Sequence, residues 1–293
     1  LRCAVNAAAG REEEYRIVVT ATPKKVLVIG GGPAGMEAAR VAALRGHEVM
    51  LCERDKKLGG QLHATSQVPY KEPIAELINY LGCQVTKAGV EIKLNCEVTA
   101  DFVTKEKPDV VILATGASPF IPDIYGVARA NVVHAIDVLT RRKNVGDRAV
   151  IIGGELVACD VAEFLAAQNK KVTMVRRGPE MMTKVVLPHF RKPILDRLNR
   201  KGVIMLTGVK YEQITEKGLI ISDSEGRQRI IEADTIVLAA GARANQELAK
   251  QLEDKVAAVY SIGDCVKPRR IREAIHEAYK VSISIYSQLQ NSL

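Results

Sequence analysis

The chain has 293 residues, of which 47% are hydrophobic and 26% charged, so its composition is that of a folded globular protein and excludes a disordered or fibrous one. At about 150 residues per domain, this length favours two domains. The net charge of +8 comes from 42 basic and 34 acidic residues mixed along the chain, which favours a solvated surface over a nucleic-acid interface.

The first 24 residues contain too little apolar periodicity for a domain, and we expect an arm with a β-like run at residues 15–20. From residue 25, short β-rich runs alternate with helical patterns, which is typical of a parallel sheet with crossover helices. We expect strands at residues 26–29, 48–52, 91–94, 110–114, 149–152, 171–175, 203–206, 235–239 and 259–262. We expect helices at residues 35–45, 73–81, 157–168, 190–200 and 271–288.

No apolar run reaches the roughly 18 residues that span a bilayer, and no signal peptide opens the chain. Its six cysteines include no CxxC pair, which favours a reducing compartment over a disulfide framework. We therefore expect a cytoplasmic protein with no membrane or nucleic-acid partner. Because the chain starts at Leu1 rather than Met, we expect it to be a piece of a longer protein.

The chain contains an internal duplication. Residues 25–53 (KVLVIGGGPAGMEAARVAALRGHEVMLCE) have a counterpart at residues 149–176 (AVIIGGELVACDVAEFLAAQNKKVTMVR). Likewise, DVVILATGA at 109–117 recurs as DTIVLAAGA at 234–242. A period this long indicates two duplicated domains rather than a solenoid of short repeats.

The first copy carries a glycine motif directly between a strand and a helix. Gly30, Gly32 and Gly35 have the GxGxxG spacing, and Glu53 stands at the end of the next strand. Gly30 permits a tight turn, Gly32 lets the backbone approach a pyrophosphate, and Gly35 lets the helix pack on the strand. Glu53 would accept hydrogen bonds from an adenosine ribose. We therefore predict a dinucleotide site here.

The second copy departs from this pattern. Glu155 replaces the second glycine and Ala158 the third, while Arg176 and Arg177 replace the acid. Two like charges about 4 Å apart repel by roughly 1 kcal/mol in water and roughly 4 kcal/mol at an effective dielectric of 20, so Glu155 should weaken pyrophosphate binding. The arginines could hold a 2′-phosphate and offset part of that loss. Two interpretations stay open: a site that prefers NADPH, and a nucleotide site that is weakened or lost.

Several stretches then add up to a more specific pattern: residues 2–6 (RCAVN), 10–12, 25–38, 59–62 (GGQL), 262–265 (IGDC), 268–271 and 273–277. Together they resemble the C-terminal half of the NADH:flavin oxidoreductases, the group of 2,4-dienoyl-CoA reductase, 2-enoate reductase and trimethylamine dehydrogenase. The resemblance implies an α/β fold of two Rossmann-like dinucleotide-binding domains, the second inserted in the first. The implied parts are an arm at 1–24, a discontinuous FAD domain at 25–143 and 255–293, and an NAD(P)H-binding-like domain at 144–254.

The resemblance also implies the site residues. Asp264 would bind the FAD ribitol, and the helix from Ile271 would point its positive end at the flavin. The implied FAD residues are Gly30, Gly32, Pro33, Ala34, Gly35, Glu53, Arg54, Gly60, Gln61, Leu62, Val98, Ala114, Thr115, Gly116, Gly263, Asp264 and Ile271. The implied NAD(P)H residues are Gly153, Gly154, Glu155, Arg176, Arg177 and Gly241, with NADPH weakly preferred over NADH.

Finally, the resemblance implies partners outside this sequence. In that family an N-terminal TIM barrel binds FMN and substrate, and a [4Fe–4S] cluster lies between it and the FAD half. Cys3 resembles the fourth cluster ligand, and because one thiolate cannot hold a cluster we expect no iron in this chain alone. The full protein would pass a hydride from NAD(P)H to FAD and then single electrons through the cluster to FMN. No residue is predicted to be catalytic, since hydride transfer between these groups is cofactor chemistry.

Two other functions compete with this interpretation. One is a non-catalytic domain that holds FAD or ADP, with its second site degenerate at Glu155. The other is a flavin monooxygenase or amine oxidase, which is disfavoured because such proteins generally lack a second full Rossmann repeat.

Overall fold

The computed structural model describes residues 3–185 and 188–285. The chain divides into two compact units, and unit 2 is inserted into unit 1. Unit 1 consists of Leu1–Leu62, Ile74–Ser118 and Arg243–Leu293, and unit 2 of His63–Pro73 and Pro119–Ala242. Each unit contains a parallel sheet with crossover helices, which confirms the predicted α/β class.

Unit 1 is built on a parallel sheet with the strand order β15-β4-β1-β2-β3. Its strands are β1 (Lys25–Ile29), β2 (Glu48–Cys52), β3 (Glu91–Lys93), β4 (Val110–Leu113) and β15 (Val259–Ser261). Its helices are α1 (Pro33–Leu44), α3 (Pro73–Lys87), α4 (Ala100–Glu106), α8 (Glu247–Gln251), the short 3₁₀ helix η1 (Gly263–Cys265) and α9 (Ile271–Ser284), and α2 (Leu62–Thr65) lies at the boundary of the two units.

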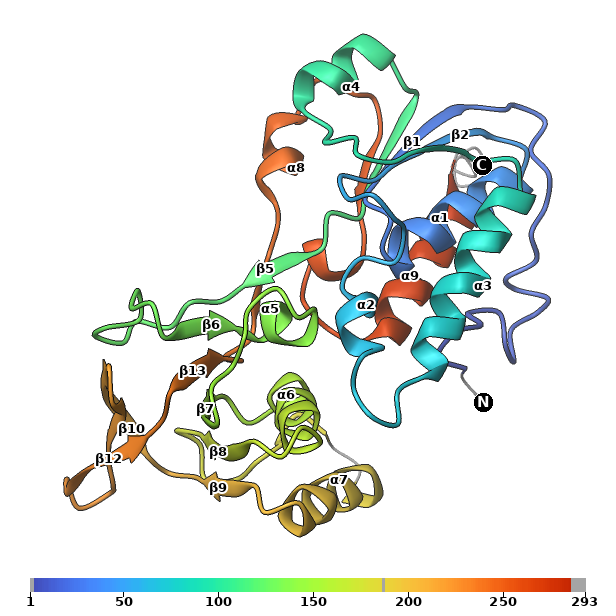
Figure 1. Cartoon of the computed structure of the whole chain (residues 1–293). Helices are drawn as coiled ribbons and strands as arrows, with labels where there is room; N and C mark the ends of the chain where they lie inside the picture. Colours follow the sequence, from blue (N-terminus) through green and yellow to red (C-terminus); the bar gives the residue numbers. More distant parts are fainter. Residues whose placement is uncertain (1–2, 186–187, 286–293) are drawn as a thin grey trace. The chain divides into compact units, whose positions relative to one another are not determined.

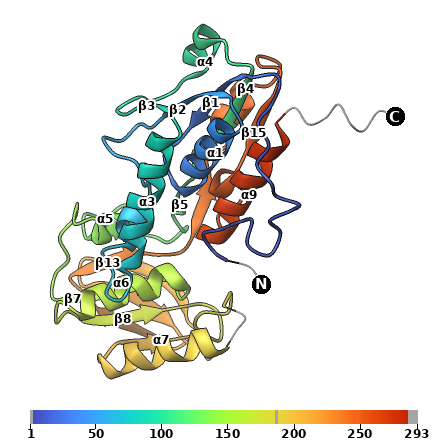
Figure 2. The ribbon, with the colours of Figure 1, turned by 90° about the vertical axis from the view of Figure 1, so that its right-hand side faces the viewer.

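Helices α1 and α9 come from opposite ends of the chain and pack side by side (Figures 1 and 2). Helix α1 starts at Pro33, where the missing N–H costs no helical hydrogen bond, and it ends before Gly46. The guanidinium of Arg45 donates hydrogen bonds to the carbonyls of Ser282 (2.9 Å) and Ile285 (3.1 Å), so it joins the C-terminal ends of the two helices.

Unit 2 repeats this plan with the strand order β6-β13-β7-β8-β9. Its parallel strands are β6 (Val132–His134), β7 (Arg148–Ile152), β8 (Lys171–Val175), β9 (Ile204–Leu206) and β13 (Thr235–Leu238), and its helices are α5 (Ala135–Leu139), α6 (Leu156–Ala166) and α7 (Pro188–Arg200). An antiparallel sheet of β10 (Lys210–Thr215), β11 (Gly218–Ser222) and β12 (Gln228–Glu232) intervenes between β9 and β13. The two chain crossings between the units, β5 (Ala117–Pro119) and β14 (Ala242–Ala244), pair with each other.

The two sheets share a detail that supports the duplication. In unit 1, the carboxylate of Asp109 accepts a hydrogen bond from the backbone N–H of Lys25 at 2.8 Å. In unit 2, Asp234 accepts the corresponding bond from Arg148 at 2.9 Å. Asp109 precedes β4 and fixes the start of β1, and Asp234 precedes β13 and fixes the start of β7, so the repeat extends beyond the glycine motifs.

Helices α6 and α7 of unit 2 are joined by a buried carboxylate. Glu163 on α6 is 3% exposed, and its side chain bonds the guanidinium of Arg197 at 2.5 and 2.7 Å and the ammonium of Lys201 at 3.2 Å. Burial alone would raise the pKa of Glu163, but the bonds to Arg197 and Lys201 outweigh it and hold the pKa below its ordinary value.

The unit boundaries differ from the expected domain boundaries. Residues 119–143 belong to unit 2 because β6 pairs with β13 and α5 packs against α6. Residues 243–254 belong to unit 1, where Leu252 is fully buried beside Val103 and Leu113. The segment His63–Pro73 joins unit 2 through Ala64 and Val68, which are buried in its core.

The nine strands and five helices expected from the sequence are present with ends shifted by a few residues, although residues 286–288 of the expected last helix lie outside the described part. The predicted β-like run at 15–20 is wrong. Val18 and Val19 are 60% and 70% exposed, and the backbone N–H of Thr20 donates to the carbonyl of Arg45 instead of pairing with a strand. The arm is held by Tyr15, whose ring stacks on Tyr279.

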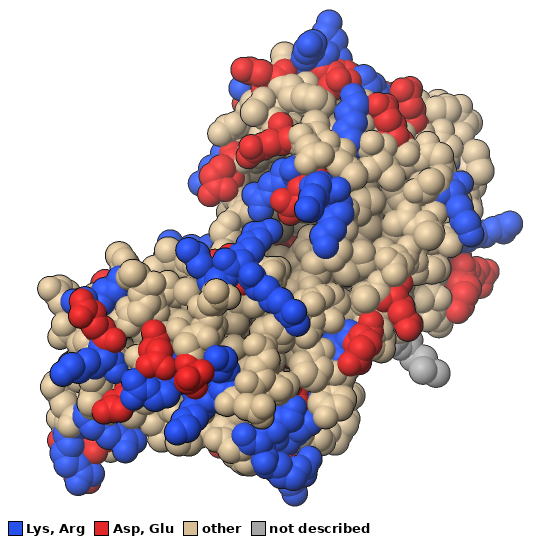
Figure 3. Space-filling model, in the orientation of Figure 1, with Lys and Arg blue, Asp and Glu red and all other residues tan. Residues whose placement is uncertain are grey.

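Basic and acidic side chains are interspersed over much of the face in Figure 3, as their mixing along the sequence suggested. Among the described residues, no helix combines the length and apolar character needed to cross a membrane.

Candidate nucleotide-binding sites

Several predicted residues of unit 1 meet at one edge of its sheet. Gly30, Glu53, Ala114 and Gly263 follow the carboxyl ends of β1, β2, β4 and β15. These strands are parallel and lie next to one another in the sheet, so their ends form a common edge. Open parallel sheets bind ligands at this edge.

The three motif glycines of unit 1 have different surroundings. Gly30 has a φ of 106°, and a Cβ there would collide with the carbonyl oxygen of Ala114. A Cβ on Gly35 would collide with the carbonyl oxygen of Gly30. By contrast, no atom of the described residues lies within 4 Å of a Cβ built on Gly32. Gly30 and Gly35 are therefore required by packing, whereas Gly32 borders open space at the N-terminus of α1.

Glu53 is buried against this turn. Its carboxylate accepts hydrogen bonds from the N–H groups of Gly31 (2.6 Å) and Asp55 (2.8 Å). The loop after Glu53 returns to the turn, because Gly59 donates to the carbonyl of Gly31 at 2.8 Å. The acid expected to contact a ribose is thus fixed in place by backbone donors.

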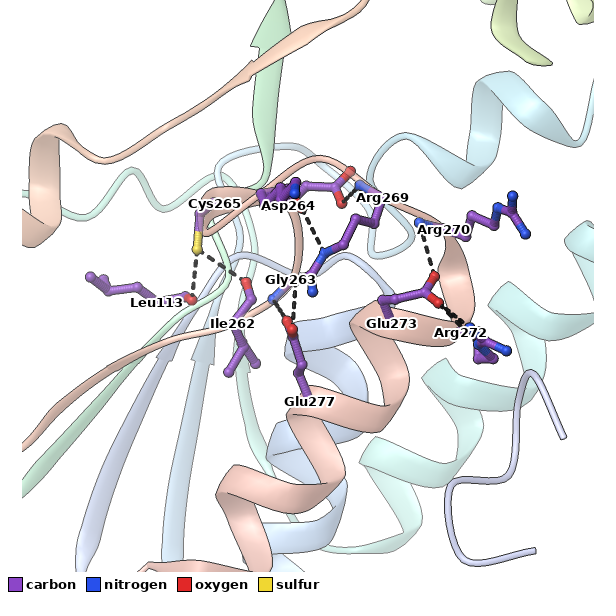
Figure 4. A network of polar contacts seen from close by, with 11 residues as sticks. Leu113, Ile262, Gly263, Asp264, Cys265, Arg269, Arg270, Arg272, Glu273 and Glu277 are labelled. Carbon is purple, nitrogen blue, oxygen red and sulfur yellow. Dashed lines mark hydrogen bonds and ion pairs between the residues drawn. The ribbon is translucent and has the colours of Figure 1, made fainter. Parts of the chain in front are cut away.

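Asp264 lies in a polar network that reaches into α9 (Figure 4). Its carboxylate accepts from the N–H of Arg269 at 2.9 Å, and the guanidinium of Arg269 pairs with Glu277 of α9 at 2.6 Å. Glu277 also accepts from the N–H of Gly263 at 2.9 Å. Burial raises the pKa of Asp264, against the opposing effect of the Arg269 bond. The Cys265 thiol donates to the carbonyl of Leu113 at the end of β4.

Sequence reasoning missed some residues of this site. Arg269 and Glu277 lie within the C-terminal motifs, but the sequence does not predict that they pair with each other beside Asp264. Asn245 was not singled out, although its side chain donates to the carbonyl of Thr115 (2.9 Å) and accepts from the hydroxyl of Ser118 (2.7 Å). Its one signal is an amide in a connection between strand and helix, which is too common to identify a site.

The other predicted residues of the first site also lie in unit 1. Pro33 opens α1, and Ile271 opens α9. Gln61 donates to the carbonyl of Ala117 at 2.8 Å, and Val98 packs against the core of the sheet. The rest of the set, Ala34, Arg54, Gly60, Leu62 and Gly116, falls within the same unit.

The glycine turn of unit 2 has the same backbone form. Gly153 has a φ of 152°, and a Cβ there would collide with the carbonyl oxygen of Ala239 at the end of β13. A Cβ on Gly154 would meet the side chains of Arg176 (2.5 Å) and Met181 (2.8 Å). Gly241 has a φ of 115° and borders open space within the described structure.

The charged residues of this turn bond one another. The carboxylate of Glu155 pairs with the guanidinium of Arg176 at 2.8 Å and accepts from the Thr183 hydroxyl at 3.1 Å. Arg176 also donates to Thr183 (2.6 Å) and to the carbonyl of Gly154 (3.1 Å). Arg177 lies over the ring of Tyr211, 5.5 Å from its centre. We name Glu155, Arg176 and Thr183 the Glu155 cluster.

Cys3 lies in unit 1, where its backbone carbonyl accepts a hydrogen bond from the imidazole of His276 at 2.8 Å. Within residues 3–185 and 188–285, no group of three or more His, Cys, Asp or Glu side chains is arranged to hold a metal ion. The thiolates that an iron–sulfur cluster requires are therefore not assembled by the described residues.

Known proteins resemble this chain over nearly its whole length. The NADH oxidase of Thermoanaerobacter brockii is 38% identical over 294 residues, which are 97% of this chain and 44% of that protein. The cinnamate reductase of Clostridium sporogenes is 38% identical, with 97% and 42% covered. The structure of a 2-naphthoyl-CoA reductase superposes with a TM-score of 0.91 at 38% identity, and it covers 97% of this chain and 43% of that one.

This chain therefore spans less than half the length of these relatives. They support the resemblance to the FAD- and NAD(P)H-binding half of the NADH:flavin oxidoreductases. The family model for pyridine nucleotide-disulphide oxidoreductases, which bind FAD and a pyridine nucleotide, matches residues 24–280. With most of the chain matched, this flavoprotein belongs to the pyridine nucleotide-disulphide oxidoreductase family.

Proposed function

We propose that this chain is the electron-input module of a flavin oxidoreductase, with FAD bound in unit 1 and NAD(P)H as the electron donor bound in unit 2. The observation that carries the proposal is the open space at Gly32. Gly30 and Gly35 are required by tight packing, but Gly32 is not. We therefore infer that glycine at position 32 leaves room for a ligand. A pyrophosphate at the N-terminus of α1 would use that space.

The residues around Gly32 fit FAD. The N-terminus of α1, which has no side-chain cap at Gly32, and its positive dipole end suit the phosphates, and Glu53 is fixed where an adenosine ribose would lie. Asp264 offers a second oxygen to the ribitol, because only one is used by the N–H of Arg269. The N-terminus of α9 would place a positive dipole near the flavin. Bound FAD supplies the capacity to accept a hydride from a nicotinamide.

The later steps of the proposal depend on parts outside this sequence. The electrons would pass to an iron–sulfur cluster and an FMN-binding TIM barrel, and Cys3 would supply one cluster thiolate. The length of the relatives supports such a partner region. Alkene or thioester substrates, suggested by the relatives' names, would be recognised there.

The test is the visible spectrum of the purified chain, followed by anaerobic addition of NADPH or NADH. We expect a yellow protein that releases FAD on denaturation and loses its colour with at least one of the two donors. A yellow protein that neither donor bleaches would contradict the electron-input role.

A second candidate, a non-catalytic nucleotide-binding domain, is favoured by the Glu155 cluster. It predicts a chain that NADPH and NADH do not reduce. A colourless protein that releases ADP would support this candidate and overturn the first.

A further inference from the structure

The glycine turn of unit 2 differs from that of unit 1 in the charged side chains that surround it, because it contains the Glu155 cluster. In unit 1, the anionic Glu53 stands at the end of the second strand and the turn presents only backbone at Gly32. In unit 2, the cationic Arg176 stands at the end of the second strand, and a carboxylate, Glu155, projects from the turn itself. The side chains of Arg176 and Glu155 are 18% and 27% exposed, so their 2.8 Å pair is only partly screened by water.

The positive charge of Arg176 is already paired with the carboxylate of Glu155 in this arrangement. Its guanidinium is shared by the carboxylate of Glu155, the hydroxyl of Thr183 and the carbonyl of Gly154. The Glu155 carboxylate is held from a second side, because it accepts from the N–H of Lys184 at 3.2 Å. A nucleotide therefore meets a turn whose cation is occupied and which carries a carboxylate residue, Glu155, at the N-cap of α6, where the motif has glycine and backbone would approach a pyrophosphate.

From this geometry we infer that Glu155 is an internal competitor for Arg176, which lowers nucleotide affinity at unit 2 and sets its selectivity for the 2′-phosphate. A 2′-phosphate is nearly dianionic and accepts bidentate bonds from a guanidinium, so it can take Arg176 from a single carboxylate. A 2′-hydroxyl has no charge and cannot make this exchange. NADH thus meets the repulsion of Glu155 without compensation, whereas NADPH gains Arg176. This inference rests on the proposed pyridine nucleotide site and names the residue that controls it.

The test is equilibrium binding of NADP⁺ and NAD⁺, measured by isothermal titration calorimetry, to the whole chain and to two variants. Glu155→Gln removes the charge and keeps the size, while Glu155→Gly restores the glycine of the motif. For Glu155→Gln we expect at least about tenfold tighter NADP⁺ binding and a smaller gain for NAD⁺, because only NADP⁺ uses the released Arg176. Adding Arg176→Gln to Glu155→Gln should remove the extra gain for NADP⁺.

Asp147→Asn is the matched control. It also deletes one negative charge from unit 2 and breaks one ion pair, that of Asp147 with Lys170 at 3.0 Å. Asp147 precedes β7, so it lies at the opposite edge of the sheet from Gly153. We expect affinities within twofold of the parent, which would show that the gain does not come from net charge alone. Thermal unfolding of each variant checks that unit 2 is intact.

The inference is overturned if Glu155→Gln and Glu155→Gly bind both nucleotides within twofold of the parent, or if neither binds NADP⁺ at millimolar concentration. A larger gain for NAD⁺ than for NADP⁺ would also overturn it. The proposed function fails separately, through loss of FAD or absence of reduction, because the calorimetric measurement needs neither flavin nor turnover.

Discussion

The two glycine turns of this chain share a backbone and differ in chemistry. In both, a glycine with positive φ lies against the carbonyl that follows a neighbouring strand, Ala114 after β4 in unit 1 and Ala239 after β13 in unit 2. In unit 1 the neighbouring acid, Glu53, is held by backbone N–H groups of its own loop and turn. In unit 2 the acid of the turn is held by an arginine. Strand pairing and close packing thus preserve the turn, while the charges that select a ligand change independently.

The third motif position carries this comparison into the cores. Gly35 lies so close to the carbonyl of Gly30 that a methyl group has no room. The corresponding residue of unit 2, Ala158, carries that methyl group and is fully buried. Helix α1 can therefore approach its sheet only with glycine at this position, whereas α6 accommodates a methyl group there.

Gly35→Ala should have the largest effect on stability. The added methyl would overlap backbone that cannot turn aside, and we expect a loss of about 3 kcal/mol. Urea unfolding followed by far-UV circular dichroism measures it. Gly82→Ala in α3 is the control, because no atom of the described chain lies within 4 Å of a Cβ there and the change should stabilise the helix by about 1 kcal/mol. Equal effects of both would refute the packing role of Gly35.

Glu163→Gln tests the link between α6 and α7. We expect a loss of about 2 kcal/mol at neutral pH, since Arg197 and Lys201 would lose a charged acceptor. The pKa of Glu163 is held below its ordinary value, so its contribution is present above that value and is lost as pH falls through the folded-state pKa. The difference between parent and variant should therefore shrink below about pH 4.

Urea unfolding at neutral pH and again below about pH 4 measures the difference in the free energy of unfolding between the parent and Glu163→Gln. The control is Glu225→Gln, whose 3.0 Å pair with Arg227 is exposed and should contribute less than about 1 kcal/mol. A gap between parent and Glu163→Gln that stays constant with pH would mean that the carboxylate acts through packing instead of charge.

Gly32→Ala should have the smallest effect on stability and a specific effect on the cofactor. A methyl group fits the open space, so we expect a loss of no more than about 1 kcal/mol at this helix N-cap. Its FAD content should nevertheless fall, because the methyl occupies the proposed approach of the pyrophosphate. The ratio of flavin to protein absorbance measures this, and an unchanged ratio would remove the main support for the first site.

The parts of the fold that were predictable are those with strong local patterns. β1 and β7 are apolar runs directly followed by glycine turns, so their positions and repetition followed from residues alone. The β10–β12 sheet was missed because its outer strands, β10 and β12, are partly exposed and carry charged residues, which a pattern of buried strands does not detect. Its middle strand, β11, is apolar and mostly buried.

The candidate sites were predictable in their residues but not in their contacts. The spacing of Glu155 and Arg176 showed that both depart from the motif, and each was then assigned a separate effect on the ligand. That they bind each other depends on how β8 and the turn meet in space, and on Thr183, which no motif marks. In unit 1, the side chains of Asn245 and Thr115 each donate to the other residue's backbone carbonyl, a contact that leaves no trace in sequence spacing.

The position of β15 has a consequence for folding. Val259 of this edge strand pairs with Val111 of β4, and all of Pro119–Ala242 lies between them in the chain. Closing this pair costs loop entropy while unit 2 is unfolded, and far less once unit 2 is compact and its two crossings have been brought together. During synthesis, β15 and α9 emerge after the whole of unit 2. Unit 2 should therefore fold first. Its folding brings the two parts of unit 1 that flank it in the sequence close together, so that β15 can pair with β4.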